Sequence, residues 1–476
     1  MSGRSVWQMS REKELAKNTI ILAFGKICTQ SISFLMLPFY TAVLDTKDYG
    51  TFDLLVTYAT LLLPLVNWQF DQGLFRFMLE KRGNHTAQSE LFSTILISGT
   101  LQSGIYAGMF FLIRPLLSIV NAEFLLAYVI LHVYTAIFLQ FVRGLGDNTK
   151  YAIAGFISAS STVVFNVITL AVFKWGLKGL FTATLLSQVF TIIYLISSSK
   201  CWRYFSVKSA KYSIFKSVRR YSLPLIPNNL AWWVVNASDR TVISHFIGLA
   251  ANGIFTVSSK FPSVFISFYN IVNLSWTESV SLHFDDEDRD VFLTDMVTMF
   301  FKIFASACFG VVAIMPFIFP IMVNTKYRDG YNQVLILMYA MLFRVLVGLY
   351  SCIYIATKQS KKVAYTSGAA AIINLTVDLL FINRIGLYAA SLSSLIAFLV
   401  MFIIRYVEIN RTVHMRIKRS AALSSIIMGA ILTGAFYSNS VMIQGIALAV
   451  TIGYGIWANA DLLRTVLKMV RKGAIG

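Results

Sequence analysis

Hydrophobic residues in this chain gather in long runs separated by short polar gaps. Each run holds about twenty residues or more, which is enough for a helix to cross a hydrocarbon layer of about 30 Å. The pattern predicts an all-α polytopic membrane protein with about fourteen spans. The predicted spans are residues 17–43, 50–78, 89–113, 119–141, 151–173, 178–197, 221–247, 252–279, 295–323, 331–356, 363–382, 386–406, 420–437 and 441–460.

The composition agrees with this class. Hydrophobic residues make up 57% of the 476 positions and charged residues 13%, and the mean hydropathy is +0.68. The formal net charge of +19 comes from Lys and Arg in many separate loops. We therefore expect these cations to meet anionic membrane lipids, and we expect no nucleic-acid partner. The four cysteines are far apart and predict neither a disulfide framework nor a metal site.

The Lys and Arg residues also predict the orientation. With the N-terminus inside, the even-numbered loops and both tails carry most of them, whereas loops such as 248–251 and 438–440 carry few or none. Both termini are therefore predicted to be cytoplasmic. The first run is too long for a cleavable signal and is expected to remain as a span.

An internal repeat divides the chain. Residues 179–187 (GLFTATLLS) recur as 386–394 (GLYAASLSS) at an offset of about 207, and YGTF at 49–52 resembles NGIF at 252–255. Spans one to six and seven to twelve are then parallel, pseudo-symmetric copies, which often enclose a central cavity. The predicted divisions are residues 1–199 for the N-terminal lobe, 200–220 for a basic cytoplasmic linker, 221–410 for the C-terminal lobe, and 411–476 for two further helices and a basic tail.

Several cations lie inside predicted spans, where each costs about 2.5–3.5 kcal/mol on insertion scales. Counting along the helices places Arg76 near the cytoplasmic end, Lys26 in the inner half, Arg344 near the middle, and Arg240 with Lys260 in the outer third. This distribution predicts a cavity with anion-binding positions at several depths, and phosphate is the obvious anion. Arg76 fits a side chain that reaches back to the inner interface equally well.

Acidic residues are fewer inside the spans. Asp71, Asp239 and Asp378 are candidates for coupling transport to a proton or sodium gradient. Asp239 also fits a structural partner of a neighbouring cation. No other cofactor and no metal are expected.

The span at 221–247 has the most informative pattern. Pro224 and Pro227 weaken its backbone ladder and predict a bend. Four polar or aromatic residues then recur at spacings of four, three and four, which places them on one helical face. Amides, an indole and a guanidinium suit sugar hydroxyls, a sugar face and a phosphate, respectively. These residues are Asn229, Trp233, Asn236 and Arg240.

Residues 221–264 resemble the polysaccharide repeat-unit flippases of the multidrug/oligosaccharidyl-lipid/polysaccharide exporter superfamily. The resemblance is carried by Pro224 with Pro227, by Asp239-Arg240, and by Lys260 after two serines, and helix count and two-lobe layout extend it over nearly the whole chain. It implies a monomer in the bacterial cytoplasmic membrane. By alternating access, it would move an oligosaccharide on undecaprenyl diphosphate from the inner to the outer leaflet.

The resemblance further implies a cationic cavity for the diphosphate and sugar, and polymerase and chain-length partners in polysaccharide assembly. Arg344 matches no motif of that family, so its role rests on depth alone.

Three alternatives remain open at this stage. A teichoic-acid-unit or peptidoglycan-precursor (lipid II) flippase would carry a similar phosphate. A cation-coupled drug exporter of the same superfamily would favour acidic residues in its cavity, against the excess of cations here. A membrane glycosyl or acyl transferase would need acidic or His residues in large outer loops, which are short in this chain, so a transporter is expected rather than an enzyme. No Walker-type phosphate loop is present.

Overall fold

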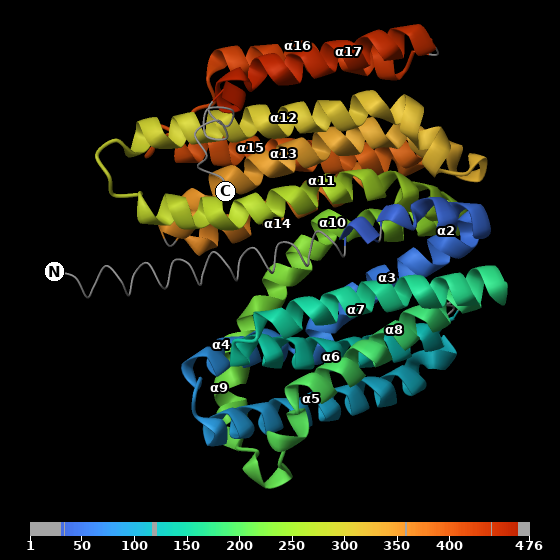
Figure 1. The fold of residues 1–476 in the computed structure, drawn as a ribbon, viewed down its shortest axis with the longest axis vertical. Helices are drawn as coiled ribbons and strands as arrows, with labels where there is room; N and C mark the ends of the chain where they lie inside the picture. The colour runs from blue at the N-terminus through green and yellow to red at the C-terminus, as the bar shows by residue number, and fades with distance from the viewer. Residues whose placement is uncertain (1–29, 33, 117–120, 358, 439, 465–476) are drawn as a thin grey trace. The chain divides into compact units, whose positions relative to one another are not determined.

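The computed structural model describes residues 30–464 except 33, 117–120, 358 and 439 (Figure 1). Every regular element in this part of the chain is helical. The chain forms two compact units, one up to Trp233 and one from Val234 onward. The boundary falls inside a helix, α10 (Ile226–Phe246).

The other helices follow one another along each unit. The first unit contains α2 (Leu37–Val43), α3 (Thr46–Asn67), α4 (Phe70–Glu80), α5 (His85–Ile113), α6 (Ala122–Leu145), α7 (Asn148–Asn166), a π-helical turn (Val167–Val172), α8 (Gly176–Ser199) and α9 (Tyr212–Ser222). The second contains α11 (Leu249–Leu282), α12 (Arg289–Met322), α13 (Tyr331–Ala356), α14 (Ser360–Ile385), α15 (Leu387–Ile409), α16 (Arg419–Phe436) and α17 (Val441–Ala458).

Eleven helices of the described residues are long and apolar enough to cross a membrane. The all-α class is confirmed, and this number agrees roughly with the fourteen expected spans. The expected span at 17–43 runs over residues outside the described part. The expected spans at 221–247 and 252–279 correspond to α10 and α11, which contain 21 and 34 residues but carry more polar side chains than the eleven.

The expected span at 50–78 is broken in two. Helix α3 ends at Asn67 and α4 begins at Phe70, and between them Trp68 and Gln69 adopt left-handed backbone angles with φ of 51° and 57°. This conformation costs a residue with a side chain roughly 1–2 kcal/mol. The break is therefore an energetically costly feature that packing in the first unit must offset.

The prolines near the start of α10 also interrupt a helix. Helix α9 ends at Ser222, a 3₁₀ turn covers Leu223–Leu225, and α10 begins at Ile226. The change of helix type occurs where Pro224 removes a backbone donor. The sequence pattern thus located this interruption correctly.

Helix α13 lies at the centre of the second unit, where it packs against α11, α12 and α15 (Figure 1). The approach to α11 is close. The indole N–H of Trp276 donates to the Leu349 carbonyl at 3.0 Å, and a Cβ added at Gly348 would lie 1.9 Å from the Tyr269 hydroxyl oxygen. Glycine at 348 therefore permits this helix contact.

We expect Gly348→Ala to lower the free energy of unfolding by about 1–3 kcal/mol, because the new methyl group overpacks the contact with Tyr269. The apparent melting temperature of the detergent-solubilised protein measures the effect. Gly368→Ala on α14 is the control, since a Cβ there has open space around it. Equal melting temperatures for the two variants would contradict the close approach.

The basic segment 200–220 belongs to the first unit. Its helix α9 packs against α4 and α5. The Ser93 hydroxyl donates to the Tyr204 carbonyl at 3.1 Å, and the Lys211 amide donates to the Thr94 hydroxyl at 3.0 Å. The segment is thus an ordered element, while the lobe boundaries drawn from the sequence stay predictions.

Cys201 in this segment is poorly suited to thiol-labelling tests of the membrane orientation. Its side chain is 3% exposed, and burial raises the pKa of its thiol to about 11, although a contact with the Ser199 hydroxyl acts in the opposite direction. The thiolate is the reactive form. We expect maleimide to label Cys201 slowly at pH 7.5 and faster as the pH approaches 11.

An introduced cysteine at the exposed Lys208 position tests the orientation instead. Lys208→Cys should be labelled quickly by an impermeant reagent from the cytoplasmic side only, and Ser438→Cys from the outside only. Labelling of Lys208→Cys in intact cells would contradict the orientation predicted from the loop charges.

Candidate functional site

A cavity of about 270 Å³ lies inside the second unit, between α10, α11, α13 and α15. Apolar side chains such as Phe255 and Phe398 form much of its wall. The charged and polar groups that line it are Asn236, Asp239, Arg240, Ser259, Ser263, Arg344 and Ser394.

Two guanidinium groups converge on Asn236. Arg344 on α13 donates from Nη1 to the Asn236 side-chain oxygen at 2.7 Å. Arg240 donates from Nη1 to the Asn236 carbonyl at 3.2 Å and from Nη2 to the Ser259 hydroxyl at 3.3 Å. The Asn236 and Ser259 oxygens are neutral acceptors, and Asp239 lies close enough to Arg240 for the two charges to interact. Guanidinium groups recognise phosphate oxygens in a bidentate manner, so this arrangement suits a phosphate or diphosphate.

The local sequence explains half of this arrangement. Asn236 and Arg240 are four residues apart on α10, which places them one above the other on one face. Arg344 reaches the same point from the middle of α13, and its guanidinium also lies 5.8 Å from the ring centroid of Phe398. The Phe398 ring and the Asn236 amide together hold the Arg344 guanidinium in one orientation.

A buried acidic pair adjoins the cavity. Asp239 on α10 is 3% exposed, Asp378 on α14 is fully buried, and the two carboxyl groups interact electrostatically. The Ser394 hydroxyl donates to Asp239 Oδ2 at 2.9 Å. Among the described residues, neither oxygen of Asp378 has a hydrogen-bond partner. A buried carboxylate without partners is costly, so this position calls for a proton or a cation.

Hydroxyl and amide side chains lie beside Asp239 of the acidic pair. Asn374 lies one turn before Asp378 on α14 and lies close enough to Asp239 to interact with it. Its side-chain oxygen accepts from Ser238 at 3.2 Å, and its amide donates to Ser393 at 3.1 Å. The carboxyl oxygens of the pair and the Ser394 hydroxyl suit a hard cation such as sodium. The described residues contain no group of three or more His, Cys, Asp and Glu that could hold a metal ion.

The structure brings four of the residues selected from the sequence together at the cavity. Asn236, Asp239, Arg240 and Arg344 line it. Lys260 follows Ser259 on α11 and is half-buried, but it is not among the lining residues. Lys26 lies outside the described residues.

The predicted four-residue face of α10 divides at the unit boundary. Asn229 donates to the Leu225 carbonyl of its own chain segment at 3.2 Å. The indole of Trp233 donates to the Thr57 carbonyl on α3 at 3.0 Å. Neither lines the cavity, which receives only Asn236 and Arg240 from this face.

Two further predicted residues lie on α4 in the first unit. Arg76 is about half exposed and forms an ion pair with Glu80 at 2.7 Å. Asp71 is 8% exposed, and its oxygens accept from Asn67 at 2.9 Å and from Gln72 at 2.7 Å. Asp71 therefore has the partners that Asp378 lacks.

Ser394, Ser259 and Asn374 are site residues that sequence reasoning missed. A signal for Ser394 was present, because it ends the repeated segment 386–394. Its counterpart Ser187 instead donates to the Ser158 carbonyl at 2.7 Å. About 207 positions before Asp378 the chain has the apolar Leu170 and Ala171. The acidic pair therefore belongs to one copy of the repeat.

The helical fold and the buried charges define a multi-pass integral membrane protein. The sequence model of a family described as polysaccharide biosynthesis protein matches residues 15–276, more than half of the chain. The chain therefore belongs to this family, which agrees with the resemblance found in the sequence. No curated protein matches the chain by sequence.

Solved structures share the fold at low identity. The lipid II flippase MurJ in an inward closed conformation gives a TM-score of 0.71 at 14% identity, over 95% of this chain and 100% of that chain. A multidrug resistance MATE family transporter of the MOP superfamily, in an inward-facing conformation, gives 0.63 at 14% identity, over 80% and 95%. An outward-facing conformation of such a transporter gives 0.58 at 14% identity, over 88% and 96%.

Proposed function

We propose that this protein is a flippase for an oligosaccharide linked to undecaprenyl diphosphate, which it moves from the inner to the outer leaflet for cell-surface polysaccharide biosynthesis. The observation that carries the proposal is the convergence of Arg240 and Arg344 on Asn236 in a cavity with both polar and apolar lining. The protein acts in the bacterial cytoplasmic membrane with both termini inside. It is a transporter and not an enzyme, and it uses no ATP.

The diphosphate offers charged acceptors to the two guanidinium groups. Hydrogen bonds from Arg240 and Arg344 to phosphate oxygens are charge-assisted, and such bonds are roughly twice as strong as neutral ones. The Asn236 amide then becomes available for a sugar hydroxyl. Polar lining groups such as Ser259 and Ser263 offer further hydrogen bonds to the headgroup.

Alternating access completes the transport cycle. Fold relatives solved in inward-facing and outward-facing conformations support this part of the proposal. Binding or release of a proton or a sodium ion at Asp239 and Asp378 couples the cycle to an ion gradient, because Asp239 lines the same cavity as the two arginines. An ion at this acidic pair changes the charge seen by the bound diphosphate.

A lipid II flippase is the second candidate, favoured by the fold similarity to MurJ over nearly the whole chain. Its substrate also carries a diphosphate, so the arginine pair suits both. The family match to polysaccharide biosynthesis proteins supports the oligosaccharide lipid as the first candidate.

A reconstituted system tests the proposal. Liposomes containing only this protein should move a fluorescent undecaprenyl-diphosphate oligosaccharide between leaflets without ATP, as measured by a membrane-impermeant quencher. Fluorescent lipid II in parallel liposomes distinguishes the two candidates by initial rate. Strict dependence on ATP, or no movement of either lipid by correctly folded protein, would refute the flippase proposal.

A further inference from the structure

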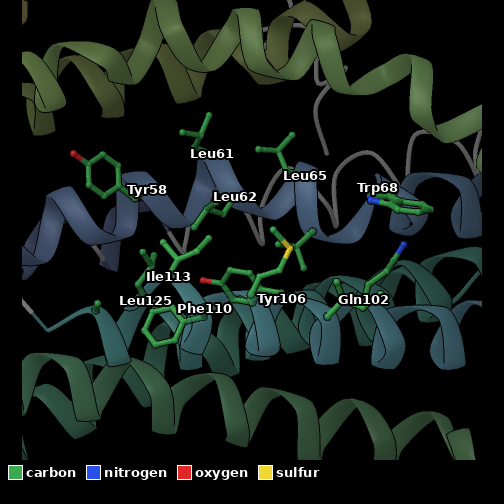
Figure 2. A pocket seen from close by; sticks show the side chains of 14 residues that line it. Tyr58, Leu61, Leu62, Leu65, Trp68, Gln102, Tyr106, Phe110, Ile113 and Leu125 are labelled. Carbon is green, nitrogen blue, oxygen red and sulfur yellow. The ribbon is translucent and has the colours of Figure 1, made fainter. Parts of the chain in front are cut away.

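An apolar groove of about 640 Å³ runs along the first unit, lined by residues of α3, α5 and α6 and by Trp68 (Figure 2). One end lies at Trp68 and Gln102, and the other at Ile113 and Leu125 (Figure 2). The stretch of α5 from Gln102 to Ile113 measures about 16 Å, roughly half the thickness of the hydrocarbon layer. The groove thus runs from mid-span toward the face that the loop charges assign to the outside.

The lining has the character of a lipid site. The side chains of Ile105 and Met109 are 63% and 54% exposed, although both lie within an apolar span. The groove is open, and most of its lining side chains offer water no hydrogen bond. At this depth an open apolar surface is filled most favourably by the chain of a lipid.

Two polar groups in the groove lack partners. Gln102 is 8% exposed, and among the described residues neither its amide nitrogen nor its amide oxygen has a hydrogen-bond partner. The same holds for the hydroxyl of Tyr106, one turn further along α5. Each unmet group costs about 1–3 kcal/mol. A saturated acyl chain leaves this cost in place, whereas the double bonds of an isoprenoid chain accept weak N–H and O–H contacts, as aromatic faces do.

The inner end of the groove coincides with the strained helix break. Trp68 is the first of the two consecutive left-handed residues, and its ring lies at one end of the row of side chains, with Tyr58 at the other (Figure 2). Strained residues of this kind gather at ligand sites because the surrounding structure must hold them in place. Tyr106 and Phe110 add two more aromatic rings, which suit the methyl branches of an isoprenoid chain.

We propose that this groove binds the isoprenoid chain of the lipid carrier, with Gln102 and Tyr106 directed at its double bonds and Trp68 closing the inner end. The inference rests on the proposed function for the choice of lipid, and it adds a chain-binding site in the first unit to the headgroup site in the second. A phospholipid acyl chain is the competing occupant, and the experiment separates the two.

Photocrosslinking in proteoliposomes tests the groove. A benzophenone amino acid replaces Met109 in one variant and Leu112, which is 79% exposed and does not line the groove, in the other. With radiolabelled undecaprenyl phosphate as probe, we expect at least about tenfold more crosslinking at 109 than at 112, equivalent to about 1.4 kcal/mol. Excess phosphatidylglycerol should not compete, and adding Gln102→Leu should lower the yield at 109.

Equal yields at the two positions, or competition by excess phosphatidylglycerol, would overturn the inference. The transport assay with the fluorescent oligosaccharide lipid is run on the same wild-type protein. Transport without selective crosslinking removes the chain site and leaves the flippase proposal intact. Selective crosslinking without transport supports the chain site and counts against the flippase proposal. The two results are independent because the probe carries the isoprenoid chain but no sugar.

Discussion

Arg344→Glu is expected to lower the initial rate of oligosaccharide-lipid transport by at least about thirtyfold. The substitution removes one of the two guanidinium groups that face the cavity and places a carboxylate beside Asn236 and near Asp239. Loss of one partner from a buried, hydrogen-bonded charge pair costs about 2–5 kcal/mol, and the new charge also repels phosphate. Arg240→Glu should act in the same direction, and Arg344→Gln should retain more activity than Arg344→Glu.

The matched control is Arg76→Gln. Arg76 also lies in an expected span but is half exposed and pairs with Glu80. A surface ion pair contributes about 0–1 kcal/mol, so transport should change by less than about fivefold. Size-exclusion profiles and melting temperatures show whether each variant is folded. Wild-type transport by folded Arg344→Glu would remove the arginine pair from the substrate path.

Asp378→Asn is expected to abolish the stimulation of transport by an ion gradient. One charge that crosses the membrane under 100 mV carries about 2.3 kcal/mol, which corresponds to a rate effect of up to roughly fiftyfold. The variant should transport at the rate that the wild-type protein shows without a gradient. Its melting temperature should not fall, because the substitution removes a buried carboxyl group whose oxygens have no hydrogen-bond partner among the described residues.

Separate sodium and proton gradients identify the ion. Asp295→Asn serves as control, because Asp295 is half exposed on α12 and forms an ion pair with Lys418 at 2.9 Å. It should keep the full gradient response. An unchanged response in Asp378→Asn would show that the acidic pair takes no part in coupling.

The sequence pattern identified the helices well and the site in part. Runs of apolar residues specify spanning helices because transfer into hydrocarbon is a local property of about twenty residues. The helical period also placed Asn236 and Arg240 on one face of α10. The same period grouped Asn229 and Trp233 with them, but Trp233 contacts α3 in the first unit instead. A face of one helix does not reveal which partner each of its turns meets.

Local patterns gave no sign of several other features. Trp68 and Gln69 carry no sequence signal for left-handed backbone, because neither is a glycine or asparagine. Cys201 follows a basic residue in a polar segment, a pattern typical of an exposed position, yet packing of that segment buries it. Both features depend on the elements that surround them.

The runs of apolar residues alone specify an all-helical, multi-pass membrane protein, and the sequence also shows which charged residues fall inside spans, where an isolated charge is costly. Which of those charges act together depends on tertiary packing. Arg344 lies 108 positions after Asn236, and Ser394 lies 155 positions after Asp239. Contacts over such separations depend on how whole helices pack, and packing is a property of complementary surfaces that no single segment contains.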